Sequence, residues 1–428
     1  MRIEMRNGRL IDPARGMDEP RDLFLADGRI AADAPPGRLE RSLRAERTID
    51  AKGKWVVPGL VDMHVHLREP GEEYKETIET GLRAAAAGGF AAVASMPNTQ
   101  PPNDARSVTE HVLRRAAAVR GARCLPIAAI TIGREGKHLT EFGELLEAGA
   151  VGFSDDGTCV ADAGLFRRAL EYARSFDTLI LQHAQEPRLT VGALAHEGPR
   201  ATRLGLAGWP SVAEELIVAR DLLLAAYTDA RLHIQHVSSA GTVDLLRAAK
   251  AKGVRVTAEV TPHHLWLTDE AIETYDTNAK VNPPLREEHD RGALREALRD
   301  GTIDCIATDH APHSVLEKVI EFDRAAFGVV GLETALPLGL ALVRDRVLTP
   351  LRLIETMSTA PARALRVPGG RLAVGDPADV TIVDPERPFR IDPSSFVSMG
   401  RNTPFGGYEV PGRAVATVVG GDIVFELA

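Results

Sequence analysis

The sequence predicts an α/β protein: a (β/α)8 TIM barrel with a small β-sandwich domain formed by its N- and C-terminal segments. Two observations predict this class. The middle of the 428-residue chain alternates short apolar runs with amphipathic helical stretches, which is typical of parallel strands joined by helices. Both ends carry β-branched runs separated by turn residues, which favours hairpins. The expected domains are residues 1–55 and 366–428 for the two parts of the sandwich and 56–365 for the barrel.

The terminal segments carry several hairpin signals. Residues 2–9 are typical of a strand that enters an Asn-Gly turn, and residues 26–30 contain an Asp-Gly turn. Near the other end, residues 375–384 place a turn before a β-branched strand, and residues 414–425 contain two apolar runs joined by Gly-Gly. We infer that the two ends pair into one small β domain.

The middle segment contains eight expected strands. They start near Val56, Phe90, Cys124, Ala150, Thr178, Arg231, Arg255 and Thr302. Amphipathic patterns at 212–227, 242–252 and 291–299 predict helices between several of them. A doubly wound open sheet is the alternative, and it is disfavoured because no Gly-x-Gly-x-x-Gly motif opens a helix.

Composition excludes several classes of protein. Hydrophobic residues make up 44% and charged residues 26% of the chain, which argues against disorder as the main state. The net charge of −9 and the lack of a long basic run argue against a nucleic-acid partner. The longest uncharged run, residues 84–103, is interrupted by prolines and glycines, so no membrane span is expected. Without an apolar signal core at residues 1–10, a cytoplasmic protein is expected.

Cysteine usage restricts the kind of metal site that this chain could build. Its three cysteines lie far apart and form no Cys-x-x-Cys pair, which argues against a disulfide framework. Any metal would therefore be held by histidine and carboxylate. Most of the 13 histidines fall into short motifs, which is the first indication of function.

Functional side chains of a barrel lie at the carboxyl ends of its strands and in the loops that follow. These ends supply His64, His66, Asp156, His183, His236 and Asp309. His64 and His66 are two residues apart, so they face the same side of a strand. Imidazole and carboxylate without thiolate suit Zn²⁺ in a catalytic site with open positions, and six ligands are enough for two metals that share a bridge.

Each of these residues also has a structural interpretation. An acidic pair before glycine is often a turn, and strand parity does not choose between Asp155 and Asp156. A lone histidine after a strand is more often a hydrogen-bonded structural residue. Ligand types on five strand ends favour the metal site. His233 should face away from His236 and is interpreted as structural, and Asp304 should face outward.

Two stretches carry a resemblance to a known family. Residues 62–71, Asp-Met-His-Val-His-Leu-Arg-Glu-Pro-Gly, and residues 307–318, Ala-Thr-Asp-His-Ala-Pro-His-Ser-Val-Leu-Glu-Lys, resemble the two signatures of dihydroorotases of the class I bacterial type in the amidohydrolase superfamily. Further matches lie at residues 96–99, 259–264, 281–286, 327–328 and 331–334. The resemblance covers nearly the whole chain, including the split β domain.

The resemblance implies a ligand set. It assigns the six strand-end residues to one or two zinc ions per subunit, and it selects Asp156 rather than Asp155. A carboxylated lysine bridges the metals in many relatives, whereas this chain has the acidic pair at that strand. The nearest lysine, Lys137, lies well before the strand, so no modified lysine is expected.

The resemblance also implies an activity, the zinc-dependent reversible cyclisation of N-carbamoyl-L-aspartate to L-dihydroorotate in pyrimidine (UMP) biosynthesis. A metal-bound hydroxide is the expected nucleophile of this cyclic amidohydrolase, and Asp309 is the expected general acid and base. The implied substrate contacts are His66, Arg68, Asn98, Asn282, His313, Phe327 and Gly328. Arg68 shares the face of His66, and a guanidinium binds a carboxylate bidentately.

The other implied residues have simpler interpretations. Turn chemistry beside proline is the structural alternative for Asn98 and Asn282. His263 and His264 are expected to pack or to support the site. Residues 314–326 are hypothesised to form a mobile lid.

Two competing functions share much of this pattern. A hydantoinase or allantoinase would keep the metal ligands, but a neutral ring substrate does not need Arg68. A catalytically inactive homologue that serves as a structural subunit of aspartate carbamoyltransferase would have lost ligands, and this chain keeps them. The sequence leaves open whether the protein forms a homodimer and whether it binds that transferase.

Overall fold

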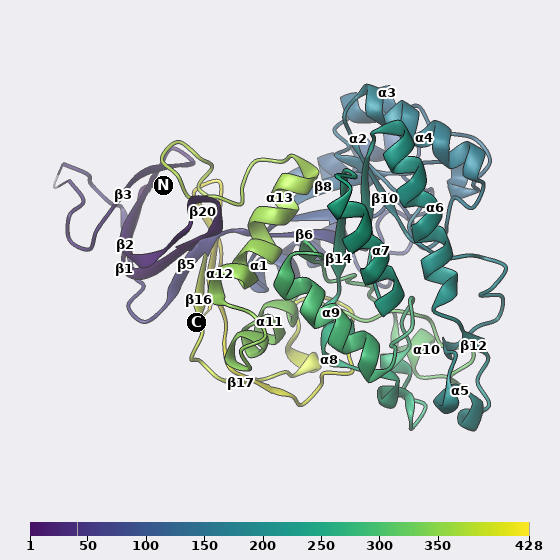
Figure 1. The fold of residues 1–428 in the computed structure, drawn as a ribbon. Coiled ribbons are helices and arrows are strands. Elements are labelled where there is room, and N and C mark those ends of the chain that lie inside the picture. The colour runs from purple at the N-terminus through teal and green to yellow at the C-terminus, as the bar shows by residue number, and fades with distance from the viewer. Residues whose placement is uncertain (41, 428) are drawn as a thin grey trace.

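The computed structural model describes residues 1–40 and 42–427 (Figure 1). A barrel of eight parallel strands stands beside a small β domain that contains both ends of the chain. This arrangement confirms the predicted fold class. Figure 1 shows helices around the outside of the barrel and the β domain at one side of it. Within the described residues, no helix combines the length and apolarity that a bilayer crossing requires.

The barrel strands follow one another in chain order. They are β6 (Leu60–Val65), β7 (Phe90–Ser95), β8 (Arg123–Ala128), β9 (Gly152–Phe153), β10 (Leu179–Gln182), β13 (Arg231–Ile234), β14 (Val256–Val260) and β15 (Cys305–Ile306). Each pairs in parallel with the next. A parallel bridge between Val65 and His310 joins the last strand to the first, with a 2.9 Å bond from the His66 amide to the His310 carbonyl.

Helices connect the strands and cover the barrel. They are α1 (Ile78–Ala87), α2 (Arg106–Ala117), α3 (Phe142–Glu147), α4 (Ala163–Ser175), α6 (Val212–Thr228), α7 (Ala240–Ala251), α9 (Glu288–Asp300) and α11 (Ala335–Arg344). The three predicted helices are confirmed as α6, α7 and α9, with ends that shift by one to three residues. The start of α7 has a local cause, because the Ser239 hydroxyl accepts a bond from the Thr242 amide at 3.1 Å.

Shorter elements lie between the barrel strands and helices and in the segments that follow them. They are α5 (Pro199–Leu204), α8 (Pro262–Trp266), α10 (Val315–Lys318), α12 (Pro350–Ile354), α13 (Ala360–Leu365), a π-helical turn at Glu355–Thr359 and two ribbons, β11 (Ala195–His196) with β12 (Gly208–Trp209) and β17 (Phe389–Arg390) with β18 (Glu409–Val410). Apolar strand residues that face the helices pack with the apolar sides of those helices and form the main core, in which Ile180, Leu232 and Leu336 are fully buried.

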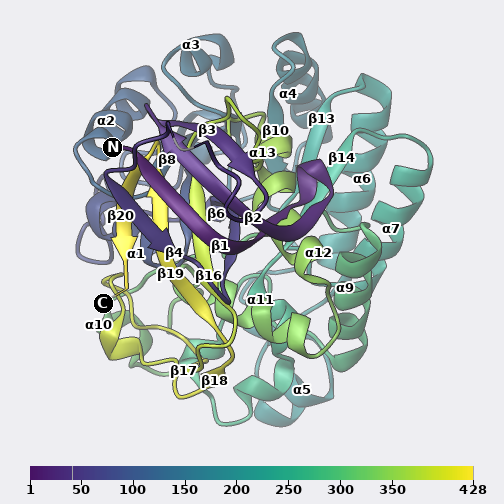
Figure 2. The same ribbon diagram turned by 90° about the vertical axis from the view of Figure 1, so that its left-hand side faces the viewer.

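The two ends of the chain form one mixed sheet (Figure 2). Its strands are β1 (Ile3–Asp12), β2 (Met17–Ala26), β3 (Arg29–Ala34), β4 (Arg47–Asp50), β5 (Trp55–Pro58), β16 (Val380–Asp384), β19 (Arg413–Val419) and β20 (Asp422–Glu426). Their order is β20-β19-β16-β5-β1-β2-β3, with β4 paired to β1. Ile3, Leu25, Val380 and Val418 share one core, so the predicted pairing of the two ends is confirmed.

Two of the three predicted hairpin turns are confirmed. Asp-Gly at 27–28 joins β2 to β3, and Gly-Gly at 420–421 joins β19 to β20, with positive φ at both residues of each pair, as type I′ turns require. The prediction of a turn at Asn7 was wrong, because β1 runs straight through it. The chain there forms a bulge with Asn7 at φ 61°, and the Asn7 amide donates to Asp22 Oδ1 at 2.7 Å.

The predicted strand from Val56 to the first site histidines was also wrong in extent. It is divided into two strands at Gly59: β5 belongs to the terminal sheet and β6 to the barrel. A Cβ atom at Gly59 would lie 2.4 Å from the Ala91 Cβ, so only glycine fits where the chain crosses between the two sheets.

Candidate metal centre and substrate pocket

The carboxyl ends of five barrel strands bring their side chains to one place. His64 lies at the end of β6 and His66 just after it, Asp156 follows β9, His183 follows β10, His236 follows β13 and Asp309 follows β15. All six are buried. The structure therefore brings together every residue of the predicted ligand set.

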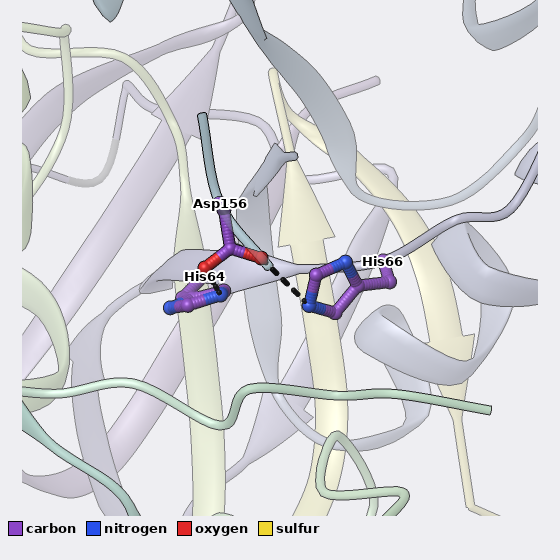
Figure 3. Close-up of side chains that lie close together, drawn as sticks. All are labelled: His64, His66 and Asp156. Atoms are coloured by element: carbon purple, nitrogen blue, oxygen red, sulfur yellow. Dashed lines mark ion pairs between the residues drawn. The ribbon is translucent and has the colours of Figure 1, made fainter. Parts of the chain in front are cut away.

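Two triads of possible ligands share one carboxylate. His64, His66 and Asp156 form the first triad, and Asp156, His183 and His236 form the second; within each triad the ligand atoms lie within 4.8 Å of one another. His64 Nε2 lies 3.2 Å from Asp156 Oδ1, and His66 Nε2 lies 3.5 Å from Oδ2. Figure 3 shows the two rings turned toward this carboxylate. A carboxylate common to two triads suits a bridge between two ions.

The second triad and Asp309 complete the cluster. His183 Nδ1 and His236 Nε2 lie 2.8 Å apart, and they lie 3.5 and 3.7 Å from Asp156 Oδ1. Asp309 belongs to neither triad, but its Oδ1 lies 3.0 Å from His66 Nε2 and 3.5 Å from His64 Nε2. Its carboxylate is therefore placed beside the first triad.

Two buried atoms in the cluster have no hydrogen-bond partner among the described residues. They are His64 Nε2 and Asp156 Oδ1. Leaving a buried polar group unpaired costs about 1–3 kcal/mol, and a cation between the triads would remove this cost. Imidazole and carboxylate ligands without thiolate suit zinc. The residues present therefore fit a bound divalent metal.

The two carboxylates of the cluster are held in their ionised form. Burial acts to raise the pKa of Asp156, but the nearby imidazoles of His64, His183 and His236 outweigh it and hold that pKa well below its usual range. Burial also acts against the charge of Asp309, and His64 and His66 hold its pKa low. Metal ligands must be deprotonated, and both carboxylates meet this condition at neutral pH.

Partners outside the cluster orient its imidazoles. His66 Nδ1 lies 2.8 Å from Asn98 Oδ1, His183 Nε2 lies 2.8 Å from Gln185 Oε1, and His64 Nδ1 lies 2.7 Å from Glu259 Oε1. In each ring the other nitrogen faces the cluster. Such partners fix the tautomer and the ring orientation of a metal-binding histidine.

Two side chains were expected to face away from the cluster, and one of them does. Asp304 lies on the outer side of the barrel and pairs with Lys250 at 2.7 Å. The prediction for His233 was wrong in direction: its neighbours Leu232 and Ile234 pack in the core outside the strands, so His233 faces the barrel interior. Its ring bonds Thr257 Oγ1 at 2.7 Å and Glu259 Oε2 at 3.1 Å, and it belongs to neither triad. Parity failed because His236 lies beyond the end of the regular strand, at φ 32°.

A cavity of about 190 Å³ borders the triads. Its walls are formed by His66, Arg68, Asn98, Asp156, Gly157, His183, His236, Asn282, Asp309, Ala311, His313, Phe327 and Gly328. All seven predicted substrate contacts lie in this one wall, although their roles stay predictions. Sequence reasoning missed Gly157 and Ala311, which carry no polar side chain that could have signalled them.

Arg68 and His313 form one side of the cavity. The Arg68 Nε donates to the Pro312 carbonyl at 3.2 Å, and His313 Nε2 lies 2.8 Å from the Phe327 carbonyl. Burial and the positive charges of Arg68 and Lys318 lower the pKa of His313 to about 3. His313 is therefore neutral at physiological pH, and Arg68 supplies the positive charge on this wall.

Three site residues adopt backbone conformations that are rare outside glycine. Arg68, His236 and Asp309 have φ of 61°, 32° and 48°. Left-handed conformations cost free energy in residues with a Cβ, and they concentrate at functional sites. In this chain they occur where a strand gives way to a site loop.

The remaining histidines and the lid segment have supporting contacts. His264 bonds Thr261 Oγ1 at 2.7 Å and the Pro283 carbonyl at 3.1 Å, beside Asn282. His263 is buried outside the cavity wall, and burial lowers its pKa to about 4.

The hypothesised lid contains α10, and Lys318 Nζ donates to the Ala326 and Gly328 carbonyls at 2.7 and 3.1 Å. Its mobility stays a prediction.

Comparison with known proteins assigns the chain to characterised groups. A family model described as "Dihydro-orotase-like" matches residues 53–242, and one described as "Amidohydrolase family" matches residues 181–425. Curated relatives named dihydroorotase, from Syntrophus aciditrophicus and Syntrophotalea carbinolica, are each 52% identical to this chain, with 100% of both proteins covered.

Solved structures share the architecture. L-Hydantoinase (dihydropyrimidinase) from Arthrobacter aurescens matches with a TM-score of 0.88 at 28% identity, covering 99% of this chain and 96% of that one. Dihydropyrimidinase from Brevibacillus agri matches with a TM-score of 0.84 at 22% identity, covering 100% of this chain and 95% of that one. The second likeness is one of fold alone.

Proposed function

The chain belongs to the dihydroorotase family of the amidohydrolases, and from this premise we propose that it catalyses the zinc-dependent, reversible cyclisation of N-carbamoyl-L-aspartate to L-dihydroorotate in pyrimidine biosynthesis. One observation carries the proposal beyond family membership: Arg68 lines the same small cavity as the shared carboxylate Asp156. Both forms of the substrate carry a carboxylate beside the amide that is made or broken. A site that reacts with this amide needs a positively charged side chain beside the substrate carboxylate and a metal centre beside the amide.

Among the described residues, Arg68 is the only arginine or lysine in the cavity wall, so it is the group that pairs with the substrate carboxylate. Its guanidinium is buried, with 8% of the residue exposed. A charge-assisted bidentate pair is stronger in such a site than in water. Asn98 and Asn282 line the same cavity, and the buried Oδ1 atom of Asn282 has no hydrogen-bond partner in the described part of the chain. That oxygen is available to an N–H group of the substrate.

The two triads and Asp309 are the groups that would hold zinc, with one or two ions per subunit. When bound, zinc supplies Lewis acidity that polarises a carbonyl and lowers the pKa of water to about 7. Asp309 is the general acid and base. In ring opening its carboxylate accepts a proton from the attacking water and passes it to the ring nitrogen as the amide bond breaks.

The same groups act in reverse when the ring closes. The Asp309 carboxylate accepts a proton from the ureido nitrogen as that nitrogen forms the new amide bond, and it passes the proton to the carboxyl oxygen that leaves as water. His313, which is neutral, offers one hydrogen bond without competing for the substrate carboxylate. Phe327 and Gly328 complete the wall against which the ring lies.

A hydantoinase is the second candidate, because the L-hydantoinase structure has nearly the same fold. The identity of 28% to that protein is well below the 52% to the dihydroorotases. An unsubstituted hydantoin ring has no carboxylate, so the buried Arg68 guanidinium would face the substrate without a carboxylate to bind. This arrangement would cost binding energy.

A substrate panel tests the proposal. Purified, zinc-loaded protein is incubated separately with L-dihydroorotate, hydantoin and allantoin, and ring opening is followed by ultraviolet absorbance. We expect turnover of L-dihydroorotate alone. Turnover of hydantoin or allantoin without L-dihydroorotate would reject the proposal in favour of the sister amidases. Light scattering with and without aspartate carbamoyltransferase decides whether the protein forms a homodimer and whether it binds that enzyme.

A further inference from the structure

We propose that Asn402 is a positioning residue for the substrate pocket, which it serves by holding together the two loops that carry His313 and Gly328. The inference rests on the proposed function and deepens it. Asn402 lies between β17 and β18, in the C-terminal segment beyond the barrel, and it does not line the cavity. Nothing in its local sequence, Arg-Asn-Thr-Pro, indicates a role in the site.

The carboxamide of Asn402 is fully used by these two loops. Its Nδ2 donates to the Ala311 carbonyl at 2.9 Å and to the Gly328 carbonyl at 3.0 Å. Its Oδ1 accepts a bond from the His313 amide at 3.1 Å. An asparagine side chain offers two N–H donors and one oxygen, so both donors and the acceptor point to cavity-lining residues. Asn402 is 3% exposed, and water is not an alternative partner.

The two loops meet closely at the point where Asn402 binds them. A Cβ atom on Gly328 would lie 2.7 Å from the Ala311 Cβ and 3.2 Å from His313 Nε2. Gly328 also has φ of 130°, which other residues rarely adopt. The separation of the loops is therefore set by backbone contact on one side and by the Asn402 carboxamide on the other. The contact between His313 Nε2 and the Phe327 carbonyl depends on that separation.

This geometry separates substrate binding from chemistry. The loops that Asn402 holds carry predicted substrate contacts, whereas Asp156 and His183 are positioned by β9 and β10, and the side-chain bonds of Asn402 go to Ala311, His313 and Gly328 instead. Loss of the carboxamide should loosen one wall of the pocket while leaving the metal ligands in place. Uniform weakening of substrate binding raises KM with little change in kcat.

The test compares Asn402→Ala and Asn402→Asp with Thr403→Ala. Thr403 is buried next to Asn402, but its hydroxyl accepts a bond from the Phe405 amide rather than from a pocket loop. We expect KM for L-dihydroorotate to rise about tenfold or more in both Asn402 variants, because the Ala311 carbonyl loses its side-chain donor and the Gly328 carbonyl keeps only the bond from Lys318. Zinc content and kcat should stay within about threefold of wild type, as should every parameter of Thr403→Ala.

A second readout does not depend on turnover. Hydrogen exchange of peptides that cover residues 311–314 and 327–331 should become about tenfold faster in Asn402→Ala, and it should stay unchanged in Thr403→Ala. Asn402→Asp keeps the acceptor for the His313 amide, but it places a carboxylate against two carbonyls. It should therefore loosen residues 327–331 more than residues 311–314, which gives a second test if the alanine variant does not fold.

The outcomes distinguish this inference from the proposed function. If wild type does not act on L-dihydroorotate, the proposed function fails, and hydrogen exchange still decides the role of Asn402. Unchanged KM together with unchanged exchange in the two loops would overturn the inference. So would a fall in kcat and zinc content with faster exchange throughout the barrel, which would mean that Asn402 serves only general stability.

Discussion

Asp155 and Asp156 are neighbours in the chain whose carboxylates lie in different surroundings. The Asp155 carboxylate accepts a bond from the Thr131 amide at 3.0 Å and another from the Thr131 hydroxyl. The Asp156 carboxylate faces the imidazoles, with Oδ1 3.2 Å from His64 Nε2. Asp155 thus anchors the loop after β8, and only Asp156 takes part in the triads.

This difference predicts opposite results for two equivalent substitutions. Asp156→Asn should lower zinc affinity by more than about 100-fold, because even changes outside the ligand shell cost 10–100-fold. Asp155→Asn should keep its zinc and lose only stability, since its partner is the Thr131 loop. Zinc per subunit after dialysis against a weak chelator measures both. Retention of zinc by Asp156→Asn and its loss from Asp155→Asn would reverse the assignment.

Glu259 should tune the metal centre without touching it. One of its oxygens lies 2.7 Å from His64 Nδ1 and the other 3.1 Å from His233 Nε2. Glu259→Gln should reduce zinc affinity about 10–100-fold, because a neutral amide no longer fixes the tautomer of His64 as strongly. Competition with a chromophoric chelator gives the affinity directly.

Asp304→Asn is the matched control for Glu259→Gln. Asp304 bonds the Ala258 amide of the same strand, β14, but it lies on the outer side of the barrel. The zinc affinity of Asp304→Asn should equal that of wild type. Equal affinities in both variants would show that Glu259 does not orient His64.

Arg68→Lys should weaken substrate binding while leaving the metal in place. Lysine keeps the positive charge but loses the planar fork that binds a carboxylate bidentately. We expect KM for L-dihydroorotate to rise about 10–100-fold, as for the loss of a charge-assisted hydrogen bond. Steady-state kinetics measure it, and Arg83→Lys on the exposed face of α1 is the control. A wild-type KM in Arg68→Lys would remove the carboxylate-binding role of Arg68.

Stability should fall in mild acid partly because of His313. Burial and the charge of Arg68 lower its pKa from 6.5 to about 3 in the folded protein. Between pH 6.5 and pH 3, His313 is protonated in the unfolded chain but neutral in the folded protein. His313 therefore does not lower the free energy of unfolding above pH 6.5, and it lowers it progressively as the pH falls from 6.5 toward 3. At pH 5 the loss amounts to about 2 kcal/mol relative to pH 7.5.

Urea unfolding of wild type and His313→Gln at pH 7.5 and pH 5 isolates this effect. The difference in unfolding free energy between the two proteins should shift by about 2 kcal/mol in favour of the variant at pH 5. The other titrating groups are common to both proteins and cancel to first order. No shift would mean that His313 is not held neutral in the pocket.

The sequence predicts the metal cluster well for a physical reason. A barrel places the carboxyl ends of all its strands at one face, so ligand types at strand ends must converge even when they lie far apart in the chain. His64 and His66 needed only the two-residue period of a strand. The outward direction of Asp304 followed from the same period. His233 did not follow it, because His236 lies beyond the regular strand, and His233 faces the interior beside Glu259.

Other features depend on packing that no local pattern reports. One apolar run passes from one sheet to the other at Gly59, where Ala91 lies so close that no side chain would fit. The Asn7 position continues a strand because β2 pairs along both sides of the bulge. Asn402 bonds residues that lie 74 to 91 positions earlier in the chain. Glu259 lies in a stretch that matches the family, but its partners are set by the barrel closing around them.

Metal-dependent hydrolysis of L-dihydroorotate tests the central claim most directly. Protein stripped with a chelator is assayed before and after addition of zinc, alongside Asp309→Asn with its zinc content measured. We expect no turnover in the stripped protein, recovery with zinc, and loss of turnover in Asp309→Asn under conditions in which zinc is still bound. Turnover that persists without metal, or full activity in a zinc-loaded Asp309→Asn, would contradict it.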